Sequence, residues 1–137
     1  MRRTPEEQSL DRLLRHRYGE LVEAIAREES FAARSMFHCL ACYLHGRLKL
    51  VLADRERPWD GILVPTTRED QPSLRGEMPA LRPHPVLGKW LYLAASVESF
   101  EDDAQRLVEL ALADDPRVGV EPQARRARGS ARRRRTR

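Results

Sequence analysis

The stretch from residue 35 to residue 53 constrains the fold most, because it predicts two strands folded back on each other. Its first half, SMFHCLACYL, is apolar on both faces, as is usual for a well-buried strand. His45-Gly46 then supplies a tight turn, since glycine tolerates a positive φ. The second half, RLKLVLA, alternates in polarity. We expect its side chains to divide between the two faces of a sheet: Leu48, Leu50 and Leu52 inward, Arg47 and Lys49 outward.

Three helices and two further strands are predicted around this hairpin. Thr4-Pro5-Glu6-Glu7 is a capping box, and apolar residues then recur at helical spacing until Glu28 or Glu29, with Gly19 marking a bend. Thr67, with Asp70 three residues on, is expected to cap a short helix that runs through about Gly76. Ser99, with Asp102 three residues on, is expected to cap a last helix that ends at Asp115-Pro116. The further strands are GILVP (61–65) and KWLYL (89–93).

The order of these elements is helix, hairpin, strand, helix, strand, helix, with short connections. Such connections favour an α+β fold. We expect a mainly antiparallel four-stranded sheet, with the N-terminal, middle and C-terminal helices packed on it, in a single domain over residues 1–121.

The end of the sequence is strongly basic and differs from the rest of the chain. Residues 122–137 hold eight arginines and no acid, which leaves 17 basic and 21 acidic residues in 1–121. The body therefore carries −4 and this tail +8. We expect the tail to be disordered and to bind nucleic acid without sequence preference, through Arg125, Arg126, Arg128, Arg132, Arg133, Arg134, Arg135 and Arg137.

The sequence predicts a cytoplasmic protein. The residues MRRTPEEQSLDR are charged with no apolar run behind them, so we expect no signal peptide. The longest apolar stretch, around Phe37 to Leu44, spans about eight residues, far below the roughly 20 that a membrane helix needs. Two cysteines suit a reducing compartment.

The segment HCLACYLH (38–45) contains both cysteines and two of the four histidines. In a strand, Cys39 and Cys42 point to opposite faces, because side chains alternate. They then cannot share one metal ion, and we interpret them as buried structural residues, with no cofactor expected. A metal- or thiol-dependent protein that uses Cys39 and Cys42 is the alternative, and it requires a break in the strand.

The loop RPHPVLGKW (82–90) is the best candidate for a contact surface. Arg82, His84 and Lys89 are three donors on a segment stiffened by prolines, and Trp90 stands beside them. Such a set suits a phosphate, a carboxylate or an acidic partner surface. The alternative interpretation is that the prolines shape a crossover and that Trp90 belongs to the core.

Two motifs resemble a known group of small proteins. Met36, Phe37, Leu40, Tyr43, Gly46 and Arg47 match the helix-to-hairpin segment of the TfoX N-terminal domain-like family, and Lys89 and Trp90 match a strand of the related MmcQ/YjbR group. His38 and Cys39 stand where that family has two glycines. The resemblance implies a small non-enzymatic α+β module, linked to competence regulation or DNA binding, and supplies no catalytic residue.

From these observations we expect a cytoplasmic binding or regulatory module that acts on a protein partner or on nucleic acid. A small-ligand-binding domain, with a pocket between sheet and helices, is a further alternative. No internal repeat and no catalytic motif of the G-x-S-x-G, H-E-x-x-H or G-x-G-x-x-G type occurs in the sequence.

Overall fold

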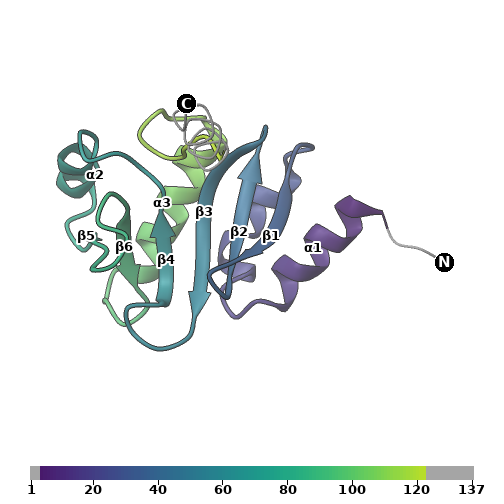
Figure 1. Ribbon diagram of the computed structural model, residues 1–137, viewed down its shortest axis with the longest axis horizontal. Helices are drawn as coiled ribbons and strands as arrows, with labels where there is room; N and C mark the ends of the chain where they lie inside the picture. Colours follow the sequence, from purple (N-terminus) through teal and green to yellow (C-terminus); the bar gives the residue numbers. More distant parts are fainter. Residues whose placement is uncertain (1–3, 123–137) are drawn as a thin grey trace, which may run out of the picture.

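The computed structural model describes residues 4–122, and its centre is one antiparallel sheet (Figure 1). The sheet has six strands in the order β1-β2-β3-β4-β6-β5. Their bounds are β1 Ala32–Met36, β2 Cys39–Leu44, β3 Arg47–Asp54, β4 Asp60–Val64, β5 Arg82–Pro83 and β6 Leu91–Ala94. The predicted α+β class and antiparallel pairing are confirmed.

The prediction of four strands is wrong, because two strands were missed. The expected strand over 35–44 is interrupted at Phe37 and His38, whose φ angles are 54° and 62°. The chain reverses there, so β1 pairs antiparallel with β2. The other missed strand, β5, lies within the proline-rich loop, where its two residues pair with Tyr92 and Leu91.

The helices are α1 (Pro5–Arg15), the 3-10 helix η1 (Glu20–Arg27), α2 (Gln71–Glu77) and α3 (Phe100–Leu112). The predicted capping box is formed: the Glu7 amide donates to Thr4 Oγ1, and the Thr4 amide donates to Glu7 Oε1, each at 3.0 Å. The predicted single helix to residue 28 or 29 is instead two helices, with the expected bend at Gly19. A Cβ atom at Gly19 would lie 1.7 Å from the Leu13 carbonyl oxygen, so this close approach requires glycine.

The main core lies between the sheet and the helices. η1 and α3 run behind the sheet in Figure 1 and contact each other. Leu50, Leu52 and Ile62 of the sheet pack there with Leu107 and Val22 of these helices, all fully buried. Burial of such side chains stabilises the fold by about 1.5–3 kcal/mol each.

Helix α1 closes one edge of the sheet. It lies beside β1, where Ser9 Oγ accepts from the Ala33 amide at 3.0 Å and Arg12 Nη1 donates to the Ala33 carbonyl at 3.3 Å. The outward polar groups of Ala33 are thereby paired with side chains instead of another strand. At the opposite edge, β5 is two residues long and contains Pro83. Pairing with a further strand is therefore blocked at Ala33 on one edge and at Pro83 on the other.

A bulge in β3 changes which residues face the core. Between Cys42 and Tyr43 of β2 the partner changes from Leu50 to Leu48, so Lys49 is the extra residue. As a result the Leu48 side chain packs on the outer face of the sheet, which is the face without helices, whereas Leu50 packs on the face toward the helices. Lys49 is 1% exposed. The predictions that Leu48 faces the same side as Leu50 and that Lys49 points outward are therefore wrong.

After α3 the chain returns across β3 in a segment that we call the C-terminal strap (113–122). Lys49 Nζ donates to Asp114 Oδ1 at 2.7 Å, and Leu48 and Val120 exchange backbone hydrogen bonds of 3.0 Å. Arg47 forms an ion pair of 2.6 Å with Glu121. The predicted disordered tail and its arginines lie outside the described residues. Within residues 4–122, no helix has both the length and the apolar character needed to cross a membrane.

Candidate functional site

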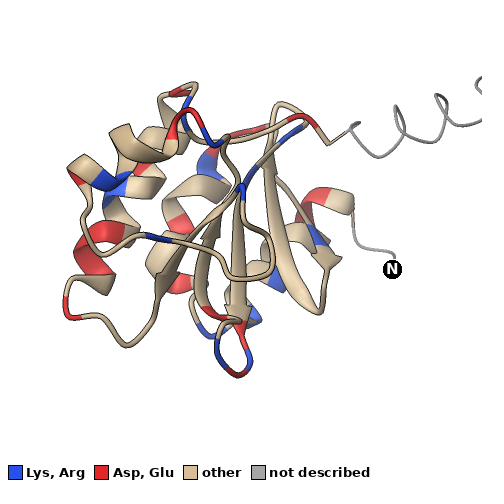
Figure 2. Ribbon diagram, turned by 60° about the vertical axis from the view of Figure 1, so that its left-hand side comes forward, with Lys and Arg blue, Asp and Glu red and all other residues tan. Residues whose placement is uncertain are grey.

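The outer face of the sheet, which faces the viewer in Figure 1, is apolar and carries no helix layer. Small buried side chains fill its middle: Cys39, Ala41, Val51 and Ala53. Figure 2 shows that charged residues concentrate on helices and loops, whereas the strands hold few of them. An apolar sheet face is normally covered by another layer, and here loops supply the cover.

A cleft of about 490 Å³ lies on this face, and we call it the sheet cleft. Its walls come from the β1–β2 turn, from β2 and β3, from the segment after β4, from the loop before β6 and from the C-terminal strap. The lining residues are Met36, Phe37, Tyr43, Leu48, Thr66, Thr67, Lys89, Trp90, Val120, Glu121 and Pro122. Most of these side chains are apolar or aromatic, which is typical of a binding site.

Phe37 stands at one end of the sheet cleft and is 53% exposed. It also lines two neighbouring hollows, so three concave surfaces meet at this ring. Its φ of 54° lies in the left-handed region, where a bulky side chain costs about 1–2 kcal/mol. A two-residue turn with positive φ at both positions normally uses Asn-Gly. Backbone strain at a residue with an exposed aromatic side chain is typical of functional positions.

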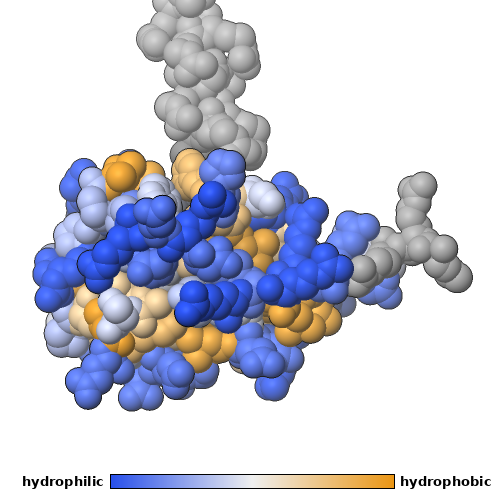
Figure 3. Space-filling view, turned by 90° about the horizontal axis from the view of Figure 1, so that it is seen from below, coloured by the Kyte–Doolittle hydropathy of each residue, from blue (hydrophilic) through white to orange (hydrophobic). Residues whose placement is uncertain are grey.

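Hydrophobic side chains are exposed at the end of the molecule that holds the β1–β2 turn. Seen from there, hydrophobic areas lie among hydrophilic side chains (Figure 3). Val86, on the loop before β6, is 66% exposed and shares a hollow with Phe37 and Trp59. The ring centroids of Phe37 and Trp59 are 6.2 Å apart. This hollow extends the apolar surface beyond the sheet cleft.

The four residues predicted as contacts do not form one cluster. Lys89 and Trp90 line the sheet cleft. His84 is 1% exposed and both its ring nitrogens are engaged: Nδ1 accepts from the amides of Val86 and Leu87 at 3.1 and 3.0 Å, and Nε2 lies 2.9 Å from the Pro58 carbonyl. His84 therefore holds two loops together, and the geometry does not support it as an anion donor.

The His84 geometry fixes its protonation state. Because Nδ1 accepts two hydrogen bonds, the proton is on Nε2 and donates to Pro58. Burial lowers the pKa of His84, and the hydrogen bond to Pro58 offsets part of that shift. The neutral ring is the form that the loop requires.

Arg82 lies in β5, but its guanidinium turns back onto its own loop. Nη1 donates to the carbonyl of Pro79, and to that of Leu81 at 2.9 Å. Arg82 is absent from the lining of the sheet cleft. The predicted set of three donors is therefore divided between a structural histidine, an arginine on its own loop and Lys89 in the cleft.

The two cysteines lie on opposite faces of β2, as the alternation predicts. Cys42 packs in the core under the helices, and Cys39 packs in the outer cluster. Burial raises the pKa of Cys42 to about 12 and is the main cause of the raised pKa of Cys39. A raised pKa means a small thiolate fraction, so neither thiol is activated as a nucleophile or metal ligand. This geometry gives no support to a shared metal.

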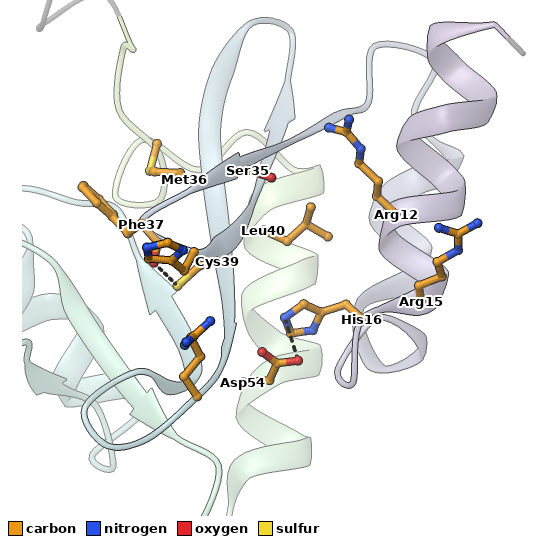
Figure 4. Close-up of a pocket in the computed structure, with 11 residues that line it drawn as sticks. Arg12, Arg15, His16, Ser35, Met36, Phe37, Cys39, Leu40 and Asp54 are labelled. Carbon is orange, nitrogen blue, oxygen red and sulfur yellow. Dashed lines mark hydrogen bonds and ion pairs between the residues drawn. The ribbon is translucent and has the colours of Figure 1, made fainter.

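A second hollow, of about 730 Å³, lies between α1 and the β1–β2 turn (Figure 4). His16 points toward Asp54, with Nε2 3.7 Å from Oδ2. The guanidinium groups of Arg12 and Arg15 point away from this pair (Figure 4), toward Ala33 and Asp11. The charged groups of this hollow therefore do not converge on a common point, and the sheet cleft is the better candidate site.

Sequence reasoning missed most of the sheet cleft. It found Lys89 and Trp90 in one loop, but it placed Tyr43 and Leu48 in the hairpin without assigning them to a site. The signal that could have indicated the site is the phenylalanine at this turn, because a bulky residue rarely adopts positive φ. Comparisons of the chain with protein-family models, with curated proteins and with solved structures found no match. The resemblance to the TfoX N-terminal domain-like family therefore stays a prediction.

Proposed function

We propose that this protein is a cytoplasmic, non-enzymatic binding module that docks an extended segment of a partner protein in the sheet cleft. The single observation that carries the proposal is the apolar cleft on the open sheet face, with the exposed and strained Phe37 at its end. The non-enzymatic character agrees with what the TfoX-like resemblance implies. The free thiols of Cys39 and Cys42 are consistent with a reducing compartment.

The closed sheet edges favour recognition through side chains. Many modules bind a peptide by adding it as a strand to an exposed edge. Here Ser9 and Arg12 occupy the polar groups of Ala33 on one edge, and Pro83 interrupts the other. A partner segment is therefore expected to place apolar side chains against Tyr43, Leu48 and Trp90.

The proposal is tested by selecting binders from a displayed random-peptide library on the full-length protein. The selected peptides are expected to share an apolar or aromatic anchor residue. Changing Phe37→Asp or Tyr43→Asp is expected to weaken their binding at least about tenfold, because one buried aromatic contact contributes more than about 1.4 kcal/mol.

Leu112→Asp is the matched control, since Leu112 is 43% exposed on α3, which lies behind the sheet. It introduces the same charge at an exposed apolar position and is expected to leave peptide affinity unchanged. Equal affinities of the selected peptides for the wild type and for Tyr43→Asp would overturn the proposal. So would an equal loss in all three variants.

A further inference from the structure

Three arginines without an acidic partner border a hollow beside helix α2, which we call the α2 hollow. Its volume is about 450 Å³, and it is lined by Arg68, Gln71, Pro72, Arg75, Gly76 and Pro79. Arg68 and Arg75 are exposed. Arg82 adjoins the hollow, because its Nη1 donates to the carbonyl of Pro79. Within residues 4–122, none of these three arginines forms an ion pair.

The guanidinium groups of Arg75 and Arg82 lie side by side. Nε of Arg75 donates to the Leu81 carbonyl at 3.2 Å, and Nη1 of Arg82 donates to the same oxygen at 2.9 Å. Two cations that share one acceptor repel each other, and an anion placed against both offsets that repulsion. Nη1 and Nη2 of Arg75, and Nε and Nη2 of Arg82, make no hydrogen bond within residues 4–122 and remain available to such an anion.

The carboxylates of this region do not neutralise the three arginines. Glu77, the only acidic residue of α2, pairs with Arg106 at 2.5 Å and with Arg117 at 3.2 Å. Glu69 and Asp70, which precede α2, do not line the hollow. The α2 hollow is therefore a local concentration of positive charge, on a chain whose first 121 residues carry a net −4.

Structural roles explain only part of this arrangement. Basic residues in the last turn of a helix often donate to nearby carbonyls at its C-terminal end. Arg75 stands in the last turn of α2, and a single bond from its Nε fulfils that role. Arg68 makes no hydrogen bond with any described residue, and its guanidinium lies over Gly88, where a Cβ atom would be 3.3 Å from Nη2. Its position beside the hollow is therefore not required by a bond within the fold.

We infer that the α2 hollow binds the phosphate group of a small phosphorylated ligand, held by Arg68, Arg75 and Arg82. The planar guanidinium fork donates two parallel hydrogen bonds to phosphate oxygens. A phosphate ester carries a charge of about −1.5 to −2 near pH 7, so it balances three cations better than a carboxylate does. Small-molecule sites have volumes of about 300–1,000 Å³, a range that includes this hollow.

This site is independent of the sheet cleft, because no residue lines both. Helix α2 lies at the end of the molecule opposite α1 (Figure 1). The sequence predicted Arg82 as an anion contact together with His84 and Lys89. In the structure its neighbours at an anion site are Arg75 and Arg68 instead.

The test follows the backbone amide resonances of the ¹⁵N-labelled full-length protein by NMR during titration with inorganic phosphate and with glycerol 3-phosphate. Ionic strength is held constant, and acetate serves as the monovalent comparison. Both phosphates are expected to give saturable shifts at the amides of Gly76 and Leu81, whereas acetate gives none. This readout assigns binding to the α2 hollow even if the arginines beyond residue 122 also attract phosphate.

Arg68→Gln is the decisive variant, since it removes one cation without removing a hydrogen bond within residues 4–122. It is expected to weaken phosphate binding at least about tenfold, because a charge-assisted contact is lost. Arg75→Lys keeps the charge but not the fork, and is expected to weaken binding as well. Arg27→Gln, at an exposed residue of η1, makes the same change in net charge and should leave the affinity unchanged.

Four results would overturn the inference. Shifts that do not saturate, or equal shifts with phosphate and acetate, show a general effect of salt. Saturable shifts that are unchanged in Arg68→Gln place the anion elsewhere, and so do phosphate shifts confined to residues beyond 122. A phosphoserine peptide that binds at these amides at least about tenfold more tightly than glycerol 3-phosphate shows that the phosphate belongs to a partner protein and not to a small ligand.

Discussion

The ammonium nitrogen of Lys49 lies 2.7 Å from Oδ1 of Asp114, and this contact joins strand β3 to the turn after α3. The Lys49 side chain is 1% exposed, whereas that of Asp114 is 71% exposed. The hydrogen bond from Lys49 lowers the pKa of Asp114. The ammonium also donates to the Val118 carbonyl at 3.3 Å. One buried lysine thus holds the C-terminal strap, which forms a wall of the sheet cleft.

We predict that Asp114→Asn lowers the thermal midpoint of unfolding, because it leaves a buried ammonium without its counter-ion. Lys49→Met is expected to lower it less, since methionine fills a similar volume without charge. The double variant is then expected to match Lys49→Met alone, and thermal unfolding of all four proteins checks this. Glu121→Gln, which breaks the more exposed pair with Arg47, serves as the control and should shift the midpoint little. Additive effects of the two changes would contradict the prediction.

Replacement of Phe37-His38 by Asn-Gly is expected to stabilise the protein and to weaken binding. Asn and Gly tolerate the φ angles of 54° and 62° better, so the free energy of unfolding is expected to rise by about 1–2 kcal/mol. Denaturation in urea measures this gain, and the selected peptides measure the loss of affinity. A replacement that stabilises the fold and leaves peptide affinity unchanged would show that the Phe37 ring is not part of the docking surface.

Thr66→Val is expected to raise stability by about 1 kcal/mol. Valine has nearly the same shape and removes a buried hydroxyl that has no partner within residues 4–122. Thr67→Val is the neighbouring control. Its hydroxyl is bonded to Asp70, so this change is expected to destabilise the fold. Urea denaturation distinguishes the two sites, and a destabilised Thr66→Val would contradict an unpaired hydroxyl.

Stability is expected to fall as the pH drops through the range in which His84 would be protonated. The pKa of His84 is lowered in the folded state, mainly by burial. The pKa of a histidine in the unfolded chain is about 6.5. The unfolded state therefore binds a proton first, and the contribution of the neutral ring, complete above about pH 6.5, is lost as the pH falls toward the folded-state pKa. Urea denaturation at several pH values from about 8 to about 5 measures this loss.

His84→Asn is the diagnostic variant for this pH effect. The side-chain oxygen of asparagine can accept in the place of Nδ1, but asparagine does not titrate. Its stability is expected to depend less on pH than that of the wild type. Burial also lowers the pKa of His16, so some dependence is expected to remain. An identical pH profile for the two proteins would show that His84 does not contribute.

The arginines beyond residue 122 are predicted to bind polyanions without sequence preference. Full-length protein is expected to bind duplex DNA with a steep salt dependence, and each phosphate neutralised contributes a slope of about −0.9 in a plot of log affinity against log salt. Changing the eight arginines to glutamine should abolish this binding. If that variant still binds DNA, the described residues, with the −4 body of the chain, must supply a basic surface of their own.

The sequence by itself determined the local features of this protein. The capping box at Thr4, the bend at Gly19 and the opposite faces of Cys39 and Cys42 follow from patterns within a few residues. Caps and side-chain alternation depend on the backbone of one element, so they can be inferred before any partner is known. The α+β class follows in the same way, from the order of the elements and their short connections.

The tertiary structure decided where these elements meet. The bulge in β3 buries Lys49, and the ammonium of Lys49 bonds to Asp114 and Val118, which are far away in the sequence. His84 lies inside, where the carbonyl of Pro58, distant in sequence, accepts a hydrogen bond from its Nε2. The sheet cleft combines the turn at Phe37, the strands at Tyr43 and Leu48, and Trp90. Contacts between distant segments set register and burial, and no local periodicity encodes them.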